Sequence, residues 1–246
     1  MIVLVVLGGL LLASYFRRRK VRSSIRANMA TIALPPLQAR AGTTVEQLPN
    51  PYPPFVGTLI INDPLRDNQA GYGWMDDSKI ATAEVKGCHF CDDTYRLSID
   101  NNQTPHMVYC LALRTNFSNF VYQIEATLLR GTEIGLVFRQ TPGFRYYYFY
   151  IRRDGTYGLD RYNGITQQPR HLADGFSLAI SIELNQPNEL AVVANGNIID
   201  LYANHSHLTT VIDDTYSSGR VATGAATDAN SPAEAAFKNV LLWILE

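Results

Sequence analysis

Short runs rich in β-branched and aromatic residues, separated by turn residues, fill the chain from Gly57 onward. No helical stripe of apolar positions accompanies them. Glycine and asparagine stand in the gaps TPG, RDG, YNG, ANGN and SSG, where tight hairpins need positive φ. The predicted strands are GTLIIND, EVKGCHF, TYRLSID, HMVYCLAL, NFVYQIEATLL, IGLVFRQ, YYYFYIRR, TYGLDRY, NELAVVANG, NIIDLYAN, HLTTVID, GRVATGAAT and AFKNVLLWIL. The pattern predicts an all-β sandwich or barrel, and because no fixed period repeats, it disfavours a propeller.

Alternation within the runs predicts which side chains face the core. In FVYQIEATLL, the inward set is Phe120, Tyr122, Ile124, Ala126 and Leu128, and the outward set is Val121, Gln123, Glu125 and Thr127. In IGLVFR, Leu136 and Phe138 are predicted inward and Arg139 outward. In the tyrosine-rich run, the inward set is Tyr147, Phe149 and Ile151, and the outward set is Tyr146, Tyr148, Tyr150 and Arg152. We therefore expect Tyr148 and Tyr150 to be exposed.

The first residues have a different composition. Residues 1–16 form an uncharged apolar run, and RRRK follows it directly. A signal peptide carries its positive charges before the apolar segment, so a transmembrane anchor over 1–16 is the better match, although the run is somewhat short. A basic juxtamembrane segment and a proline-rich linker follow over 17–54, which leaves 55–246 as the globular domain.

The charges are distributed unevenly between these parts. Residues 1–40 hold seven basic residues and no acid, and the whole chain holds 21 basic and 22 acidic residues, so the remainder carries 14 basic against 22 acidic, or −8. Such a domain repels a polyphosphate, which excludes nucleic acid as its expected partner. The basic cluster would keep the domain in the cytoplasm by the positive-inside rule.

Three cysteines favour the opposite location. Cys88, Cys91 and Cys110 permit one internal disulfide and one leftover thiol, and disulfides belong to oxidising compartments. The alternative is a zinc site in CHFC, which needs two further ligands; His89 lies inside the cysteine pair, and His106 and Cys110 are the only near candidates.

Several longer motifs resemble a bacterial domain of the concanavalin A-like lectin and glucanase class. They are NPYPPFVGTLIINDPLRDNQAGYGW, CHFCDDTYRLSI, NFSNFVYQIEATLL, YYFYIRRDGTYGL, NELAVVANGNIIDLYAN and FKNVLLWIL. The resemblance implies a two-sheet antiparallel jelly roll in which a first strand near Gly57 lies beside a last strand near Phe237 to Leu245. In that class the domain stands outside the cell, joined by a membrane helix and linker to serine/threonine kinases, so the resemblance implies a single-pass protein with an outer domain and a possible kinase partner in cis or in trans.

The resemblance also bears on the cysteines and on catalysis. Cys88 and Cys110 match the usual cysteine positions of the family, whereas Cys91 replaces a glycine, which implies a Cys88–Cys110 disulfide. Glucanases of this class carry several acids on one strand, because retaining hydrolysis needs two nearby carboxyl groups. On the corresponding strand only Glu125 points outward, so we expect no catalysis and no cofactor.

Two kinds of ligand site have candidate residues. Asn62, Asp63, Asp67 and Asn68, with Asp213 and Asp214, offer oxygen ligands for calcium, but their spacing matches no EF-hand and turn chemistry is the default explanation for them. A mixture of aromatic and polar groups suits sugar recognition, since a ring packs on the apolar face of a pyranose. The predicted ligand-binding residues are Gln123, Glu125, Arg139, Tyr148, Tyr150 and Arg152.

The resulting hypothesis is a non-catalytic, membrane-tethered sensing domain that recognises a glycan or a cell-surface ligand. A glycoside hydrolase and a purely structural surface module are the alternatives, because tyrosine is common on solvated sheets for reasons of strand preference alone.

Overall fold

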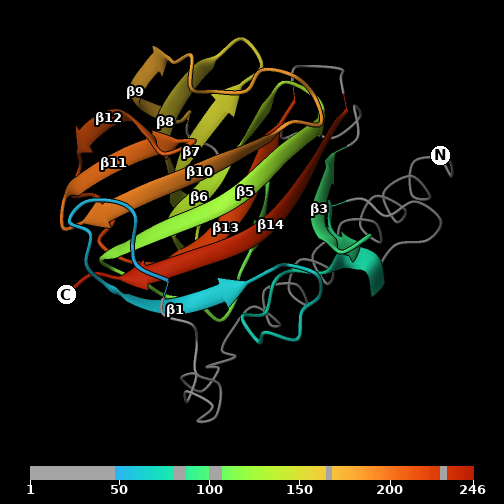
Figure 1. Cartoon of the computed structure of the whole chain (residues 1–246), viewed down its shortest axis with the longest axis horizontal. Helices are drawn as coiled ribbons and strands as arrows, with labels where there is room; N and C mark the ends of the chain where they lie inside the picture. The colour runs from blue at the N-terminus through green and yellow to red at the C-terminus, as the bar shows by residue number, and fades with distance from the viewer. Residues whose placement is uncertain (1–47, 80–86, 100–106, 165–167, 228–231) are drawn as a thin grey trace, which may run out of the picture. The chain divides into compact units, whose positions relative to one another are not determined.

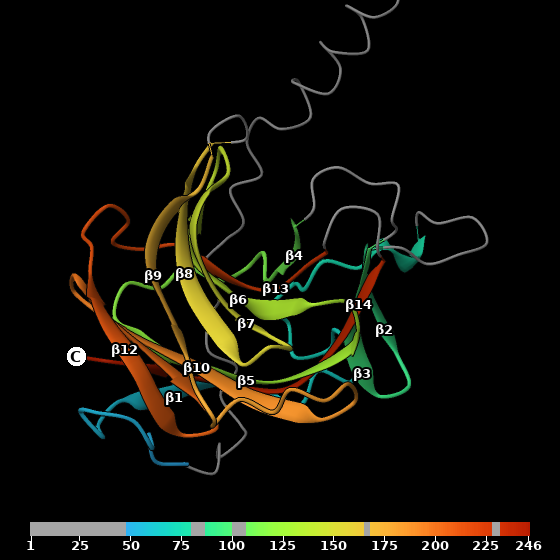
Figure 2. The ribbon, with the colours of Figure 1, turned by 90° about the horizontal axis from the view of Figure 1, so that it is seen from above.

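The described part of the chain is an all-β sandwich. The computed structural model describes residues 48–79, 87–99, 107–164, 168–227 and 232–246, so the anchor predicted over 1–16 lies outside them. Within these ranges no helix is long and apolar enough to cross a bilayer. The strands form two antiparallel sheets that stack face to face (Figures 1 and 2), which confirms the predicted two-sheet architecture.

The larger sheet has eight strands. Its order is β12-β11-β10-β5-β14-β3-β2, and β1 pairs with β14 beside this path. The bounds are β1 Thr58–Asp63, β2 Gly87–Cys91, β3 Thr94–Ile99, β5 Phe120–Arg130, β10 Pro187–Asn195, β11 Ile198–Ala203, β12 Ser206–Ile212 and β14 Ala233–Ile244. Pairing of β1 with β14 brings the first and last strands together, as the resemblance implied.

The smaller sheet has six strands, in the order β4-β13-β6-β7-β8-β9. The bounds are β4 Met107–Leu111, β6 Glu133–Thr141, β7 Arg145–Arg152, β8 Thr156–Asn163, β9 Arg170–Phe176 and β13 Arg220–Ala226. The sequence pattern missed β9, because RHLADGF does not alternate and the register shifts where β9 pairs with Leu159 and Asp160.

The inner faces of the two sheets make one apolar core. All five residues predicted inward on β5 lie in it, as do Tyr147, Phe149 and Ile151 of β7. These side chains are 0–7 % exposed, so the alternation predicted the core faces of both strands correctly.

A second apolar layer covers part of the outer face of the eight-stranded sheet. Tyr52 packs there on Tyr202, with ring centroids 4.8 Å apart, and its hydroxyl donates to Glu189 at 2.9 Å. The indole of Trp243 donates to the carbonyl of Leu48 at 2.8 Å. Residues assigned to the linker therefore pack on the sheet, and Val121 is buried beneath this layer although it points outward.

A disulfide joins the two sheets. Cys88 of β2 bonds to Cys110 of β4, with 5.7 Å between the Cα atoms, and Cys91 is free. This confirms the pairing that the resemblance implied and removes both bonded thiols from any zinc site.

Arg139 is the largest departure from simple alternation. It has a φ of 49° at a bulge of β6, where the register with β7 shifts between Phe138 and Thr141. The extra residue turns the side chain inward, so the prediction that Arg139 points outward is wrong. Its guanidinium is 0 % exposed and donates to the carbonyls of Ser118, Gly196 and Tyr216 at 2.7, 2.9 and 3.1 Å. Burial lowers its pKa, because a desolvated charge is disfavoured.

We expect Arg139→Met to destabilise the domain by about 3 kcal/mol, because three buried carbonyl acceptors lose their donor. Urea unfolding followed by tryptophan fluorescence measures the change. Arg145→Met is the matched control, since Arg145 is exposed and its guanidinium donates to the neighbouring carbonyl of Pro142 at 3.2 Å. Equal stability of the two variants would show that the buried guanidinium contributes nothing.

Candidate ligand-binding face

The six residues predicted to bind a ligand do not form one surface. Gln123 and Glu125 lie on β5 in the eight-stranded sheet, whereas Tyr148, Tyr150 and Arg152 lie on β7 in the six-stranded sheet. The outer faces of a sandwich point away from each other, so the two groups stand on opposite sides of the domain (Figure 2). Arg139 is in neither group, because it is buried.

The β5 pair is engaged in contacts within its own sheet. The Gln123 amide donates to Glu189 at 2.9 Å, and Glu125 accepts from the side chain of Asn239 at 3.1 Å. Gln123 is only 7 % exposed, so this residue offers little surface to a ligand.

Tyr148 and Tyr150 point outward but are buried, so the prediction of their exposure is wrong. Glycines explain this, because the rings lie over backbone that carries no side chain. A Cβ atom at Gly224 would stand 2.9 Å from the Tyr148 ring, and one at Gly158 would stand 2.3 Å from the Tyr150 hydroxyl. Gly135, between β13 and β7, also lies beneath Tyr148. The alternating pattern could not show this, but the glycines inside β6, β8 and β13 were the available signal.

The tyrosines join a compact layer on the outer face of the six-stranded sheet. Its buried members are Leu111, Val137, Tyr146, Tyr148, Tyr150 and Ala222, and its half-buried members are Met75, Met107, Tyr109 and Tyr162. Tyr162 stacks on Tyr146 with ring centroids 4.6 Å apart and planes 17° apart, and Tyr109 meets the Tyr146 ring edge-on at 4.9 Å. We call Tyr109, Tyr146 and Tyr162 the tyrosine platform, and its solvent-accessible rings are Tyr109 and Tyr162.

An ion pair borders this layer where β6 begins and β7 ends. The Arg152 guanidinium donates to Glu133 at 2.8 Å and also lies 4.5 Å from the centre of the Tyr150 ring. Burial raises the pKa of Glu133, and the adjacent Arg152 charge opposes that rise. Burial, with the arginine nearby only partly compensating, raises the pKa of Tyr150 to about 12. Burial raises the pKa of Tyr148 as well, so the phenols of Tyr148 and Tyr150 both stay protonated and neutral at physiological pH.

A second polar group borders the face at β8 and β9. Asp160 is opposite Tyr148 in the register and so shares its side of the sheet. His171 contacts Asp160 at 2.7 Å through Nδ1 and Asp174 at 2.9 Å through Nε2, and these hydrogen bonds raise its pKa. The outer face of the six-stranded sheet therefore carries carboxylates, an imidazole and phenols, which supply both hydrogen-bond donors and acceptors.

The acids on this face are not arranged as the glucanase resemblance requires. Glu133 is on β6, Asp160 on β8 and Asp174 on β9. Along the described strands of this sheet, no two outward carboxylates are spaced two residues apart. Glu133 and Asp160 are also already paired with Arg152 and His171.

Two of the residues considered for calcium, Asp63 and Asp213, serve local structure. Asp63 accepts from the backbone of Leu65 and from the indole of Trp74, at 2.9 and 3.1 Å. Asp213 accepts from Tyr147 at 2.5 Å and from Arg161 at 2.6 Å. Across the described ranges, no group of three or more His, Cys, Asp or Glu side chains is placed to hold a metal ion.

We expect Tyr148→Ala to cost about 3 kcal/mol of unfolding free energy, close to the cost of Phe149→Ala, because both rings leave a cavity. Thermal and urea unfolding of the two variants gives the comparison. Phe144→Ala is the control, since that ring is 44 % exposed at the β6–β7 turn. A Tyr148→Ala protein as stable as the control would mean that the ring does not fill the space above Gly135 and Gly224.

Comparison with known proteins identifies the fold. No protein-family model and no curated protein matches the sequence. The carbohydrate-binding module CBM66 from Bacillus subtilis superposes with a TM-score of 0.55 at 15 % identity, over 70 % of this chain and 95 % of that chain. A β-1,3-1,4-glucanase (lichenase) from a mouse hindgut metagenome gives 0.55 at 11 % identity, over 75 % and 99 %.

A third similar structure is a Bacillus subtilis protein of unknown function with a galectin-like fold. It gives a TM-score of 0.54 at 13 % identity, over 76 % of this chain and 96 % of that chain. At these identities the likeness concerns the fold alone, and it confirms the expected one: the described domain has the two-sheet jelly-roll fold of these structures.

Proposed function

We propose that the domain is a non-catalytic module that binds a carbohydrate chain on the outer face of the six-stranded sheet. The observation that supports this most is the tyrosine platform, with two accessible rings held in place by the buried ring of Tyr146. Pyranose rings pack against such aromatic faces. Asp160, His171 and Arg152 lie on the same outer face and carry polar groups for the sugar hydroxyls.

The fold neighbours support a carbohydrate ligand without deciding between binding and hydrolysis. One is a carbohydrate-binding module by name, and another is a glucanase. The arrangement of acids on this face favours binding, because the three carboxylates are dispersed over three strands and each of them contacts a basic side chain. A buried carboxyl such as Glu133, whose pKa is raised, is the one feature that suits a general acid.

We expect Tyr162→Ala and Tyr109→Ala each to weaken glycan binding by about 1 kcal/mol, or roughly fivefold, through loss of a stacked ring. Binding to a panel of soluble oligosaccharides, measured by calorimetry, provides the test. Phe55→Ala is the control, because that ring is 65 % exposed but precedes β1 of the other sheet.

The same panel separates the alternatives. Turnover that Glu133→Gln abolishes would replace the proposal with a hydrolase. Lack of any binding, with unchanged folding, would favour a structural module.

We further propose that the domain is tethered to a membrane and faces the outside of the cell, where a kinase partner could read its state. The Cys88–Cys110 disulfide supports this, since such bonds persist in oxidising compartments. The basic residues from Arg17 to Arg26 argue against it.

The free thiol of Cys91 offers a test of location, because it is half-buried and the other two cysteines are bonded. We expect a membrane-impermeant maleimide to label the protein on intact spheroplasts, and Cys91→Ser to abolish the labelling. Labelling that appears only after lysis would place the domain in the cytoplasm.

A further inference from the structure

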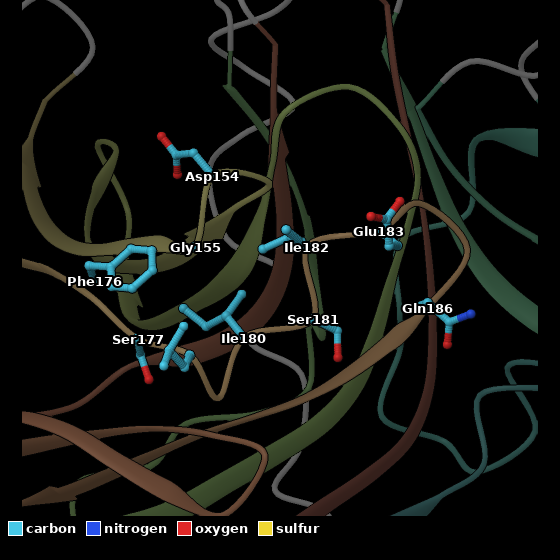
Figure 3. Close-up of a pocket in the computed structure, with 10 residues that line it drawn as sticks. Asp154, Gly155, Phe176, Ser177, Ile180, Ser181, Ile182, Glu183 and Gln186 are labelled. Carbon is cyan, nitrogen blue, oxygen red and sulfur yellow. The ribbon is translucent and has the colours of Figure 1, made fainter.

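A cleft of about 450 Å³ lies where the chain leaves β9 and crosses to β10 in the other sheet. Figure 3 shows Phe176 and Ile182 on either side of Ile180, with Asp154 and Glu183 at the rim. Ten residues line it; Phe176, Leu178, Ile180 and Ile182 are its large apolar members, and Asp154 and Glu183 are its charged members. None of them belongs to the tyrosine platform or its polar border, so this cleft is a separate feature of the domain.

The cleft exposes an unusual amount of apolar side chain. Leu178 is 92 % exposed, Phe176 63 % and Ile182 48 %, although all three lie within seven consecutive residues. Single exposed apolar residues are ordinary on soluble proteins, but a cluster of large ones around a hollow marks a binding surface. Ile180 is 4 % exposed and connects the cleft floor to the core.

Hydrogen bonds hold the walls of the cleft in shape. The backbone amide of Ser177 donates to the carbonyl of Gly155 at 3.0 Å. Ser181 exchanges two hydrogen bonds with the side chain of Asn188, at 2.8 and 3.0 Å. Phe176 lies against Gly155, where a Cβ atom would stand 2.7 Å from the ring. A wall fixed in this way needs little ordering when a ligand enters, which lowers the entropic cost of binding.

The charges at the rim indicate what kind of ligand fits. Asp154 and Glu183 are the charged members of the ten lining residues, and no lysine, arginine or histidine is among the ten. Hydrogen bonds from the side chain and backbone of Thr156 lower the pKa of Asp154, which keeps it ionised. A ligand that carries apolar groups next to positive charges therefore complements both the apolar lining and the two carboxylates at the rim. The carboxylates would repel an acidic ligand.

We propose that the cleft binds a peptide segment of a partner protein in which leucine-like side chains alternate with lysine or arginine. The apolar side chains fill the space between Phe176, Leu178 and Ile182, and the basic side chains pair with Asp154 and Glu183. This interaction does not rest on glycan binding, because the two surfaces share no residue.

Three fluorescent peptides test the proposal against the full chain, held in lipid nanodiscs so that no detergent enters the cleft. Their sequences are Ala-Leu-Arg-Leu-Arg, Ala-Leu-Glu-Leu-Glu and Ala-Ser-Arg-Ser-Arg, each acetylated and amidated. We expect the first to bind at least about tenfold more tightly than the other two by fluorescence anisotropy, since each of them lacks one of the two contributions. Equal binding of the acidic and basic leucine peptides, or no saturable binding of the first, would overturn the proposal.

Matched variants locate the binding. Leu178→Ser removes an apolar group that is almost fully exposed, so the fold is preserved, and it should weaken the first peptide about tenfold. Glu183→Gln should weaken the first peptide severalfold and leave the acidic peptide unchanged or slightly tighter. Ile212→Ser, at a 73 % exposed position of β12 outside the cleft, is the control and should change nothing. An Ile212→Ser effect as large as that of Leu178→Ser would place the binding elsewhere.

Discussion

The candidate ligand-binding face depends on tyrosine rings that pack over glycine residues. Gly135, Gly158 and Gly224 leave the outer backbone of the six-stranded sheet bare, and the rings of Tyr148 and Tyr150 fill that space. Glycine weakens a strand, and an aromatic ring laid over it restores much of the lost packing. The six-stranded sheet thus has an apolar layer on each face. Because Tyr148 and Tyr150 are buried in the outer layer, the aromatic rings that a ligand can contact are those of Tyr109 and Tyr162.

Sequence alternation predicted the inner faces well, because a sandwich core imposes one simple rule on every strand. It identified Tyr147 and Phe149 as core residues, and it predicted correctly that every second residue of β5, from Phe120 to Leu128, faces inward. It could not identify which sheet a strand joins. Strands β5 and β7 resemble each other in pattern, yet they lie in opposite sheets, and therefore Gln123 and Glu125 were wrongly grouped with Tyr148 and Arg152.

The other differences between the predicted and the observed structure have local causes, which the alternation of inward and outward residues along a strand does not reveal. One extra residue at the β6 bulge reverses the direction of Arg139, and Tyr52 covers a surface that the sequence alone leaves open. The guanidinium of Arg139 connects three loops from distant parts of the sequence through backbone carbonyls, which have no sequence signature. The disulfide was predictable only through resemblance, since three cysteines allow three pairings.

The position of the disulfide makes the two long sides of the sandwich unequal. Cys88 lies on the outermost strand β2 of one sheet and Cys110 on the outermost strand β4 of the other, so a covalent bond closes that side. At the opposite side, β12 and β9 end their sheets with no such bond, since Cys91 is the one remaining cysteine. Local opening draws on the least constrained elements, and amide hydrogen exchange would accordingly be fastest along β9 and β12. We therefore expect the two sheets to separate first along the side formed by β9 and β12, because the disulfide holds the side formed by β2 and β4 together.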